Sequence, residues 1–394
     1  MRNARIAGLA ACALLCAPRA GTSELPPPRA AADAAPRSSA PLAAALAQDP
    51  ASAASAPALR ALDEPSKRAL QLGLDWLAQA ATKPAQFGLP LGKQAAPVGV
   101  HSLALLAWLA GGSTPGRGPH GAAIDRALDW VLRQADAAPD SPARGYFHAS
   151  GDEVSRMHGH GLATLALAQA WCVGRTHRRG EEMGAALTAA VRLIERAQGS
   201  EGGWGYEPRA SFDHEGSITI HMVQALRAAR GAGVQVDAEA IARAERYVLA
   251  SQDEDGAFRY MLGDARRSVA LTAAAMSTLN MVGRYQGPAL ERGLDALRRG
   301  LLARESGDVL RTPGRPDEEI LCPFYERLFV AEALWQLPDE RIFGDWIRRE
   351  RTRLVEHQLA DGRWEDERFG DAYATAVNCL VLSLPLGYLP VFQR

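Results

Sequence analysis

The sequence is poor in the residues on which strand-rich, disulfide-bonded and nucleic-acid-binding proteins depend. Aromatic residues make up 6% of its 394 residues, and runs rich in Val, Ile and Thr are nearly absent, which argues against a β fold. Only Cys172, Cys322 and Cys379 lie beyond the N-terminal segment, and an odd number without regular spacing makes no disulfide framework. Basic and acidic residues number 44 and 45 and are spread along the chain, so nothing indicates nucleic acid as a partner. The abundant alanine and the 47% of apolar residues predict an all-α protein with a large core.

The N-terminus is expected to be an export signal followed by a tether. Residues 1–20 carry Arg2 and Arg5 before an apolar stretch, which is the layout of a signal peptide. Leu-Ala-Ala before Cys12 also resembles the lipobox of bacterial lipoproteins, so ordinary export, a lipid anchor at Cys12 and a chance apolar start all remain open. Residues 21–62, rich in Ala, Pro and Ser, predict a disordered linker, and residues 63–394 predict the folded domain. No later segment offers the ~20 apolar residues of a membrane span, so we expect an exported protein that is periplasmic, secreted or lipid-anchored.

A short motif recurs three times in the chain. Gln198, Gln252 and Gln358 are each followed six residues later by an aromatic residue, and a glycine stands two residues before that aromatic. The three aromatic residues are Trp204, Phe258 and Trp364. A fixed offset that recurs after similar helix-like stretches indicates that one supersecondary unit is used repeatedly.

Two kinds of helix-like segment alternate through the chain. One kind is amphipathic and is predicted to lie outside, whereas the other, such as HGLATLALAQAW, is apolar nearly all round and is predicted to be buried inside. Five of the six apolar segments begin with a histidine or a threonine: His101, His160, Thr219, Thr272 and Thr375. Six such hairpins predict an (α/α)6 toroid with parallel inner helices. Closure into a ring is inferred from the count of six, because an open solenoid would show the same local pattern.

The glutamine followed by Gly-x-Trp resembles the QW motif of the prenyltransferase and squalene oxidase repeat, which occurs in terpenoid cyclases and protein prenyltransferases. The resemblance extends from about residue 65 to the C-terminus, with degenerate copies from Trp76 to Phe87 and from Trp130 to Tyr146. It implies a toroid in which each QW glutamine ties off the end of a neighbouring helix and each aromatic ring stacks beside it. Independently of the resemblance, the amide of a glutamine side chain can donate to and accept from the unpaired backbone groups at a helix end. The three glutamines and their aromatic partners are therefore expected to be structural.

The catalytic motifs of these families are missing. Squalene-hopene type cyclases start their reaction with the acid of an Asp-x-Asp-Asp motif, which this sequence lacks. The nearest acidic strings are Asp253–Asp255, predicted to be a solvated turn, and Asp317–Glu319, predicted to be a charged loop. Protein prenyltransferases hold zinc with Asp, Cys and His, but Asp371–Thr375 offers no histidine and Cys322 does not belong to an Asp-x-Cys pair. The Cys-Gly-Glu-Gln of thioester domains is also absent from the sequence. We therefore expect no cofactor, and the resemblance implies no particular activity.

Four histidines, His101, His158, His160 and His221, lie near the starts of the apolar segments. In a closed ring they could meet at one end, where three imidazoles could hold zinc. They could equally satisfy loop carbonyls, or contact a ligand as acids and bases. Parallel helix N-termini would add positive charge at the same end, which favours acidic side chains such as Asp213 or an anionic ligand.

Two hypotheses on function follow from these patterns. The leading one is a non-catalytic binding or scaffold module, which holds an isoprenoid or other apolar ligand in the ring or a protein partner on its wall. The alternative is a squalene cyclase-like isomerase or lyase, which acts on an isoprenoid, lipid or polymeric substrate at the end of the ring. Its candidate donors and acceptors are His160, His221, Asp213 and Tyr373. A buried acid with a partner, or converging histidines, would favour the enzyme, whereas a ring filled by Trp108, Trp171 and Met222 would favour the scaffold.

Overall fold

The computed structural model describes residues 61–83, 87, 94–152, 154–305 and 322–393. Twelve α-helices and two short 3₁₀ helices make up the regular structure of these ranges, which contain no β-strand, so the predicted all-α class is confirmed. The predicted signal segment 1–20 with Cys12, nearly all of the linker 21–62 and the charged loop Asp317–Glu319 lie outside the described residues and remain predictions. Among the described helices, none is both long enough and apolar enough to cross a membrane.

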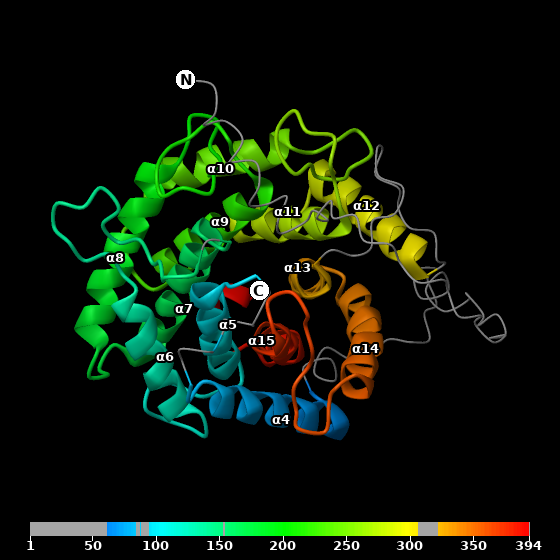
Figure 1. Cartoon of the computed structure of the whole chain (residues 1–394). Helices are drawn as coiled ribbons and strands as arrows, with labels where there is room; N and C mark the ends of the chain where they lie inside the picture. Colours follow the sequence, from blue (N-terminus) through cyan, green and yellow to red (C-terminus); the bar gives the residue numbers. More distant parts are fainter. Residues whose placement is uncertain (1–60, 84–86, 88–93, 153, 306–321, 394) are drawn as a thin grey trace, which may run out of the picture.

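The α-helices alternate along the chain between an outer and an inner layer (Figure 1). The outer helices are α4 (Glu64–Ala80), α6 (Gly121–Arg133), α8 (Gly180–Ala197), α10 (Ala238–Ala250), α12 (Pro288–Glu305) and α14 (Glu340–Glu356). The inner helices are α5 (Pro97–Ala110), α7 (Met157–Gly174), α9 (Gly216–Gly231), α11 (Val269–Met281), α13 (Pro323–Trp335) and α15 (Asp371–Ser383). The 3₁₀ helices η2 (Leu384–Leu386) and η3 (Pro390–Phe392) follow the last inner helix.

The position of each helix follows from its apolar pattern. On α6, Ile124 and Leu128 are fully buried while Arg126 and Arg133 are exposed, so one face packs on the inner layer and the other meets solvent. On α5, every residue from Pro97 to Ala110 is buried, because an inner helix is covered on all sides. The predicted division into amphipathic outer and apolar inner helices is therefore confirmed.

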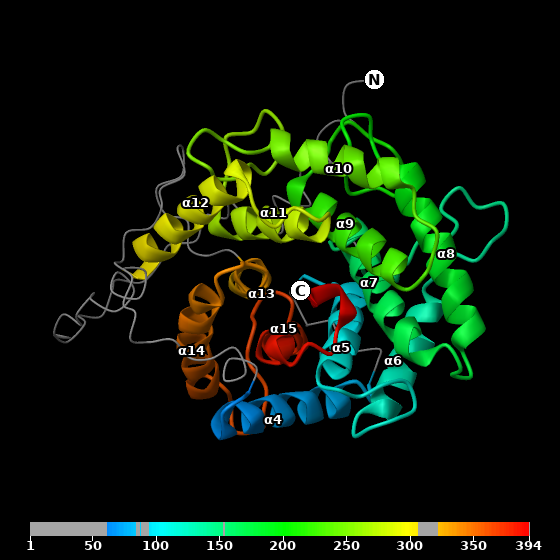
Figure 2. The same cartoon turned by 180° about the vertical axis from the view of Figure 1, so that it is seen from behind.

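The inner layer closes on itself. Helices α5, α7, α9, α11, α13 and α15 pack in that order and α15 returns to α5, while α14 packs against α4 in the outer layer (Figures 1 and 2). Across this closure the Gln358 Nε2 donates a hydrogen bond to the Ala69 carbonyl at 2.8 Å. The described chain is therefore an α/α toroid of six outer–inner helix pairs, and not an open solenoid.

Contacts between neighbouring inner helices join first turn to first turn. The Asp152 carboxyl, just before α7, accepts a hydrogen bond from the Val98 amide at the start of α5. His158 near the start of α7 bonds to Ser217 near the start of α9, and the Phe324 ring of α13 lies 5.9 Å from the Tyr373 ring of α15. The inner helices thus begin at a common end, here called the N-terminal rim, and finish at the C-terminal rim.

The motif glutamines join one outer helix to the next. Gln198, which follows α8, donates from Nε2 to the Ala240 carbonyl of α10 at 2.8 Å. Gln252, which follows α10, donates in the same way to the Ala289 carbonyl of α12 at 2.8 Å, and Gln358 donates to α4. The outer wall is thereby tied together by side-chain hydrogen bonds at the same place in successive repeats.

The two motif tryptophans are held through both the indole nitrogen and the backbone nitrogen. The indole Nε1 of Trp204 donates to the Ile194 carbonyl at 2.7 Å, and that of Trp364 donates to the Leu354 carbonyl at 2.9 Å. Their backbone amides donate to threonine hydroxyls of the following inner helix, as does that of the third motif aromatic. These acceptors are Thr219 for Trp204, Thr272 for Phe258 and Thr375 for Trp364, at 3.2, 3.2 and 3.0 Å. The threonines that open the apolar segments therefore connect the outer wall to the inner layer.

Candidate functional site

His160 occupies the threonine position of its own repeat. Its Nδ1 accepts a hydrogen bond from the Phe147 amide at 3.2 Å, as Thr219 accepts one from Trp204. The degenerate motif therefore ends at Phe147 and not at Tyr146 as the sequence suggested, because Gly145, with a positive φ of 94°, stands two residues before Phe147. Full burial lowers the pKa of His160 to about 3, so it remains neutral and braces the wall.

His101 also faces the outer layer. Its ring stacks on Trp130 of α6, with 3.6 Å between ring centroids and 7° between planes, and its edge meets Phe87. Its Nδ1 donates to the Pro97 carbonyl at 2.8 Å, and burial lowers its pKa to about 4. His101 and His160 are thus packed between the two layers and do not join the other two histidines.

His158 and His221 do meet, at the N-terminal rim. Their rings lie edge to face, 5.2 Å apart. The Ser217 hydroxyl donates to the Glu215 carboxylate and accepts from His158 Nε2 at 2.7 Å, while His221 Nδ1 donates to the Ser217 carbonyl at 2.7 Å. Burial holds the pKa of both imidazoles low, that of His221 at about 4, so both are neutral at pH 7.

Aromatic rings of α13 surround His221. Tyr325 and Phe329 lie with their ring centroids 6.0 and 5.7 Å from His221, and 4.6 Å from each other. Because α11 stands between α9 and α13 in the ring, these contacts cross the interior of the toroid. The rings of His158, His221, Tyr325 and Phe329 therefore form a continuous row of contacts from the N-terminal rim toward the interior.

The other candidate residues lie elsewhere on the rim. Asp213 is exposed in the loop before α9, whereas Glu215, two residues later, is the buried acid of that loop. Tyr373 packs its ring against Phe324 and Phe369, with centroids 5.9 and 5.1 Å away. In the described part of the chain no three His, Cys, Asp or Glu side chains have the geometry of a metal site.

A buried carboxyl lies in the middle of the inner layer. Glu332 of α13 is 2% exposed, and its Oε2 accepts hydrogen bonds from Gln224 Nε2 of α9 at 2.7 Å and from Ser277 Oγ of α11 at 2.9 Å. Burial raises its pKa to about 8, an effect that the two donors only partly oppose. At pH 7 the side chain is therefore a neutral acid shared by three inner helices.

This carboxyl predicts a specific pH dependence of stability. In the unfolded chain its pKa is near 4.5, so between pH 4.5 and about 8 the folded protein holds a proton that the unfolded chain has lost. The free energy of unfolding should therefore fall as pH rises through this window, by about 1.4 kcal/mol per pH unit from this group. Glu332→Gln removes the titration, so the difference between wild type and variant in urea unfolding should show this slope. A difference that does not change with pH would contradict the neutral state.

The large side chains expected to fill the ring lie instead between helices. Trp108 donates from Nε1 to the Leu74 carbonyl of α4 at 3.1 Å, and the Trp171 ring lies so close to Gly184 of α8 that a Cβ there would meet it at 2.9 Å. Met222 of α9 packs toward Gly161 of α7. These three side chains serve contacts between helices, so they do not decide between scaffold and enzyme.

The chain's own C-terminal segment closes the ring at the C-terminal rim. The Phe392 carbonyl accepts from Trp335 Nε1 at 2.8 Å and from Gln336 Nε2 at 3.3 Å, and the Val391 amide donates to Gln169 Oε1 at 3.3 Å. These bonds fix η3 to α7 and α13. The segment therefore occupies the centre of the ring in both views (Figures 1 and 2).

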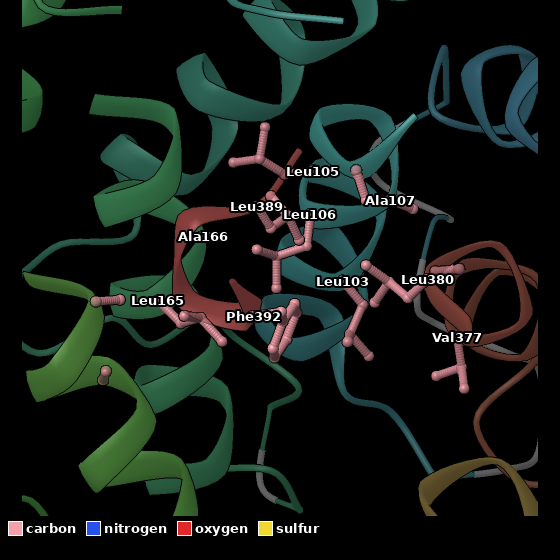
Figure 3. Close-up of a cluster of buried hydrophobic side chains, with 14 of the residues drawn as sticks. Leu103, Leu105, Leu106, Ala107, Leu165, Ala166, Val377, Leu380, Leu389 and Phe392 are labelled. Carbon is pink, nitrogen blue, oxygen red and sulfur yellow. The ribbon is translucent and has the colours of Figure 1, made fainter. Parts of the chain in front are cut away.

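Apolar packing seals the same end. Leu389 and Phe392, 4% and 5% exposed, lie in the cluster formed with Leu103, Leu105 and Leu106 of α5 (Figure 3). A cavity of about 10 Å³ remains beside the segment, which is room for a single water molecule. The C-terminal rim is therefore closed by the side chains of Leu389 and Phe392.

Comparison with known proteins agrees with the repeat. No protein-family model matches the chain. Drimenyl diphosphate synthase of Streptantibioticus cattleyicolor is 32% identical to it over 304 residues, which cover 75% of this chain and 53% of that protein. The fold is terpenoid cyclase-like. The chain spans about half the length of this curated relative.

Two solved structures of the type II terpene cyclase MstE from Scytonema also align with this terpenoid cyclase-like chain. The first, a variant in complex with the substrate geranylgeranyl dihydroxybenzoate, is 15% identical with a TM-score of 0.48. The second, the apo enzyme, is 14% identical with a TM-score of 0.34. Each alignment covers 83% of this chain and 98% of the MstE chain.

The central residues of the terpenoid cyclase-like ring were missed by sequence reasoning. Glu332 stands in the apolar run YERLFVAEALWQL, and Gln224 and Ser277 stand in the equivalent runs of α9 and α11. A charged residue inside a helix that is apolar on all sides is the signal that could have found the site, since such a helix offers it no exposed face. What the sequence could not show is that the three residues lie at the same depth in the ring.

Proposed function

We propose that the protein binds an apolar ligand of isoprenoid type inside its ring and does not cyclise it. The observation that carries the proposal is the neutral carboxyl of Glu332, held in the middle of the inner layer by Gln224 and Ser277. A few polar groups among mostly apolar helices are typical of a site that fixes one end of a mostly apolar molecule. The likeness to drimenyl diphosphate synthase supports an isoprenoid as that molecule.

Protonation states favour binding over cyclisation. A buried acid with partners and two converging histidines, the features expected of an enzyme, are both present. Protonating a carbon–carbon double bond requires a strong acid, however, and burial makes Glu332 a weaker acid than usual. His158 and His221 are neutral and so lack the extra proton of an imidazolium acid, and the sequence has no Asp-x-Asp-Asp acid. These groups suit hydrogen bonding better than proton donation to an alkene.

The ligand is proposed to enter the ring at the N-terminal rim and not at the C-terminal rim. Tyr325 is half-buried beside His221 and Phe329, which gives the N-terminal rim an aromatic surface that leads inward. At the opposite end Leu389 and Phe392 are packed into the ring. A ligand is therefore expected to enter past Tyr325 and to stop short of the C-terminal segment.

Binding can be measured on the purified full-length protein with the fluorescent apolar probe N-phenyl-1-naphthylamine. We expect saturable binding that weakens several-fold in Tyr325→Ala, because the aromatic entrance is lost, and that is unchanged in the control Tyr388→Ala, whose side chain is 57% exposed beyond the C-terminal rim. Mass spectrometry of a solvent extract would identify a co-purified isoprenoid. Absence of saturable binding would refute the proposal, and a cyclic product formed from farnesyl diphosphate or squalene would refute its non-catalytic part.

A further inference from the structure

The hydrogen bonds of Glu332 fix which of its oxygens carries the proton. Gln224 Nε2 and Ser277 Oγ both donate to Oε2, which makes Oε2 the carbonyl oxygen of the neutral acid. The proton is therefore assigned to Oε1, and neither of these two hydrogen bonds involves that atom. An O–H group among apolar helices gains free energy from a hydrogen-bond acceptor, and an oxygen atom of a ligand would supply one.

We infer that Glu332 receives the polar end of the ligand, and that this end is a neutral oxygen acceptor, a hydroxyl or carbonyl group, rather than an anion. The inference rests on the proposed function, because it specifies the ligand of the same ring.

No cation accompanies this carboxyl among the described residues. Burial and its two neutral partners are the influences on its ionisation. Arg327 of the same helix binds the Glu350 carboxylate and donates to Asn378 Oδ1 at 2.9 Å, so its charge is engaged toward α14 and α15. A phosphate or carboxylate placed at Oε1 would be buried without a counter-charge, which is strongly unfavourable.

The depth of Glu332 separates it from the positive helix ends. It is the tenth residue of α13, roughly 14 Å along the helix axis from Pro323, whereas the charge of a helix N-terminus acts mainly within the first turn. Tyr325 and Phe329 precede Glu332 by seven and three residues and so share its face of α13. The ligand is expected to enter with its polar end first and to leave its isoprenoid chain along these rings.

Three ligands with the same C15 chain test the inference by displacement of N-phenyl-1-naphthylamine: farnesol, the hydrocarbon farnesene and farnesyl diphosphate. On the full-length wild type, farnesol should bind at least about ten-fold more tightly than farnesyl diphosphate. Glu332→Gln should keep the preference for farnesol over farnesene, because its amide presents an acceptor to Gln224 and Ser277 and an N–H donor to the ligand. In Glu332→Met the ratio of the farnesol affinity to the farnesene affinity should fall about ten-fold. Because this ratio is compared between variants, the different solubilities of the two compounds cancel.

The outcomes separate the inference from the proposed function. Equal or tighter binding of farnesyl diphosphate, or an unchanged farnesol-to-farnesene ratio in Glu332→Met, would overturn the neutral acceptor while leaving the ring as a binding site. Failure of all three compounds to displace the probe would overturn both. If Glu332→Met does not fold, the preference of the wild type for farnesol over farnesyl diphosphate still decides the question.

Discussion

Replacing Trp364 by alanine is expected to lower the free energy of unfolding by about 3 to 5 kcal/mol. The indole is 3% exposed and packs against Gly73 of α4, on the far side of the ring closure. Its Nε1 and its backbone amide both make hydrogen bonds, to Leu354 and to Thr375. The substitution leaves a cavity at the joint between the last and the first repeat, where no neighbouring element can collapse without opening the ring.

Urea unfolding followed by circular dichroism would measure the loss. Trp346→Ala offers a matched control, because Trp346 lies on outer helix α14 and is only partly buried. We expect a clearly smaller loss for Trp346→Ala than for Trp364→Ala. A loss below about 1 kcal/mol for Trp364→Ala would show that the wall does not depend on this ring.

Gly202→Ala should destabilise the protein by about 2 to 5 kcal/mol, the sum of a left-handed backbone and an overpacked contact. Gly202 has a φ of 96°, and a Cβ there would lie 2.2 Å from the Arg243 carbonyl oxygen of the next outer helix. That oxygen belongs to helical backbone and cannot move aside as a side chain would. The glycine two residues before the motif aromatic is thus required both by its conformation and by the close approach of the neighbouring helix.

Gly283→Ala isolates the two contributions. Gly283 has the same φ of 96°, but a Cβ there would meet nothing within 4 Å. It should therefore lose only the backbone cost, about 1 to 2 kcal/mol. The difference between the two variants in urea unfolding measures the contact with α10, and equal losses would mean that the outer wall yields to the added methyl group.

The repeat could be predicted from the sequence because its chemistry is local. Gly202, Gly256 and Gly362 stand at the same place in the motif, and all three have a positive φ. A Cβ at any of them would lie within 2.2 to 2.5 Å of a carbonyl oxygen of the neighbouring outer helix. Such demands act within a few residues, so they leave a fixed spacing in the sequence. Closure of the ring followed from counting the repeats.

The inner site could be predicted only in part, because it depends on how each inner helix is rotated about its axis. Helices that are apolar on all sides give no periodicity from which to read a face. His101 and His160 match in sequence position yet point to the outer layer, whereas His158 and His221, at other positions, meet. The site of Glu332 could not be predicted for the same reason. Which residues of α9 and α11 meet it depends on the rotation of each helix about its axis and on the position of each residue along that axis.

Because the ring is closed, each of the six described helix pairs has a neighbouring pair on both sides. In an open solenoid the terminal repeats have one neighbour each and can fray while the middle stays folded. Here the hydrogen bond from Gln358 to Ala69 joins residues 289 positions apart, so the first and last pairs are neighbours like any others. Loss of the last pair would uncover the first as well as the fifth. The toroid should therefore unfold as one unit, and its slowest folding step should be the meeting of two segments that lie 289 residues apart in the chain.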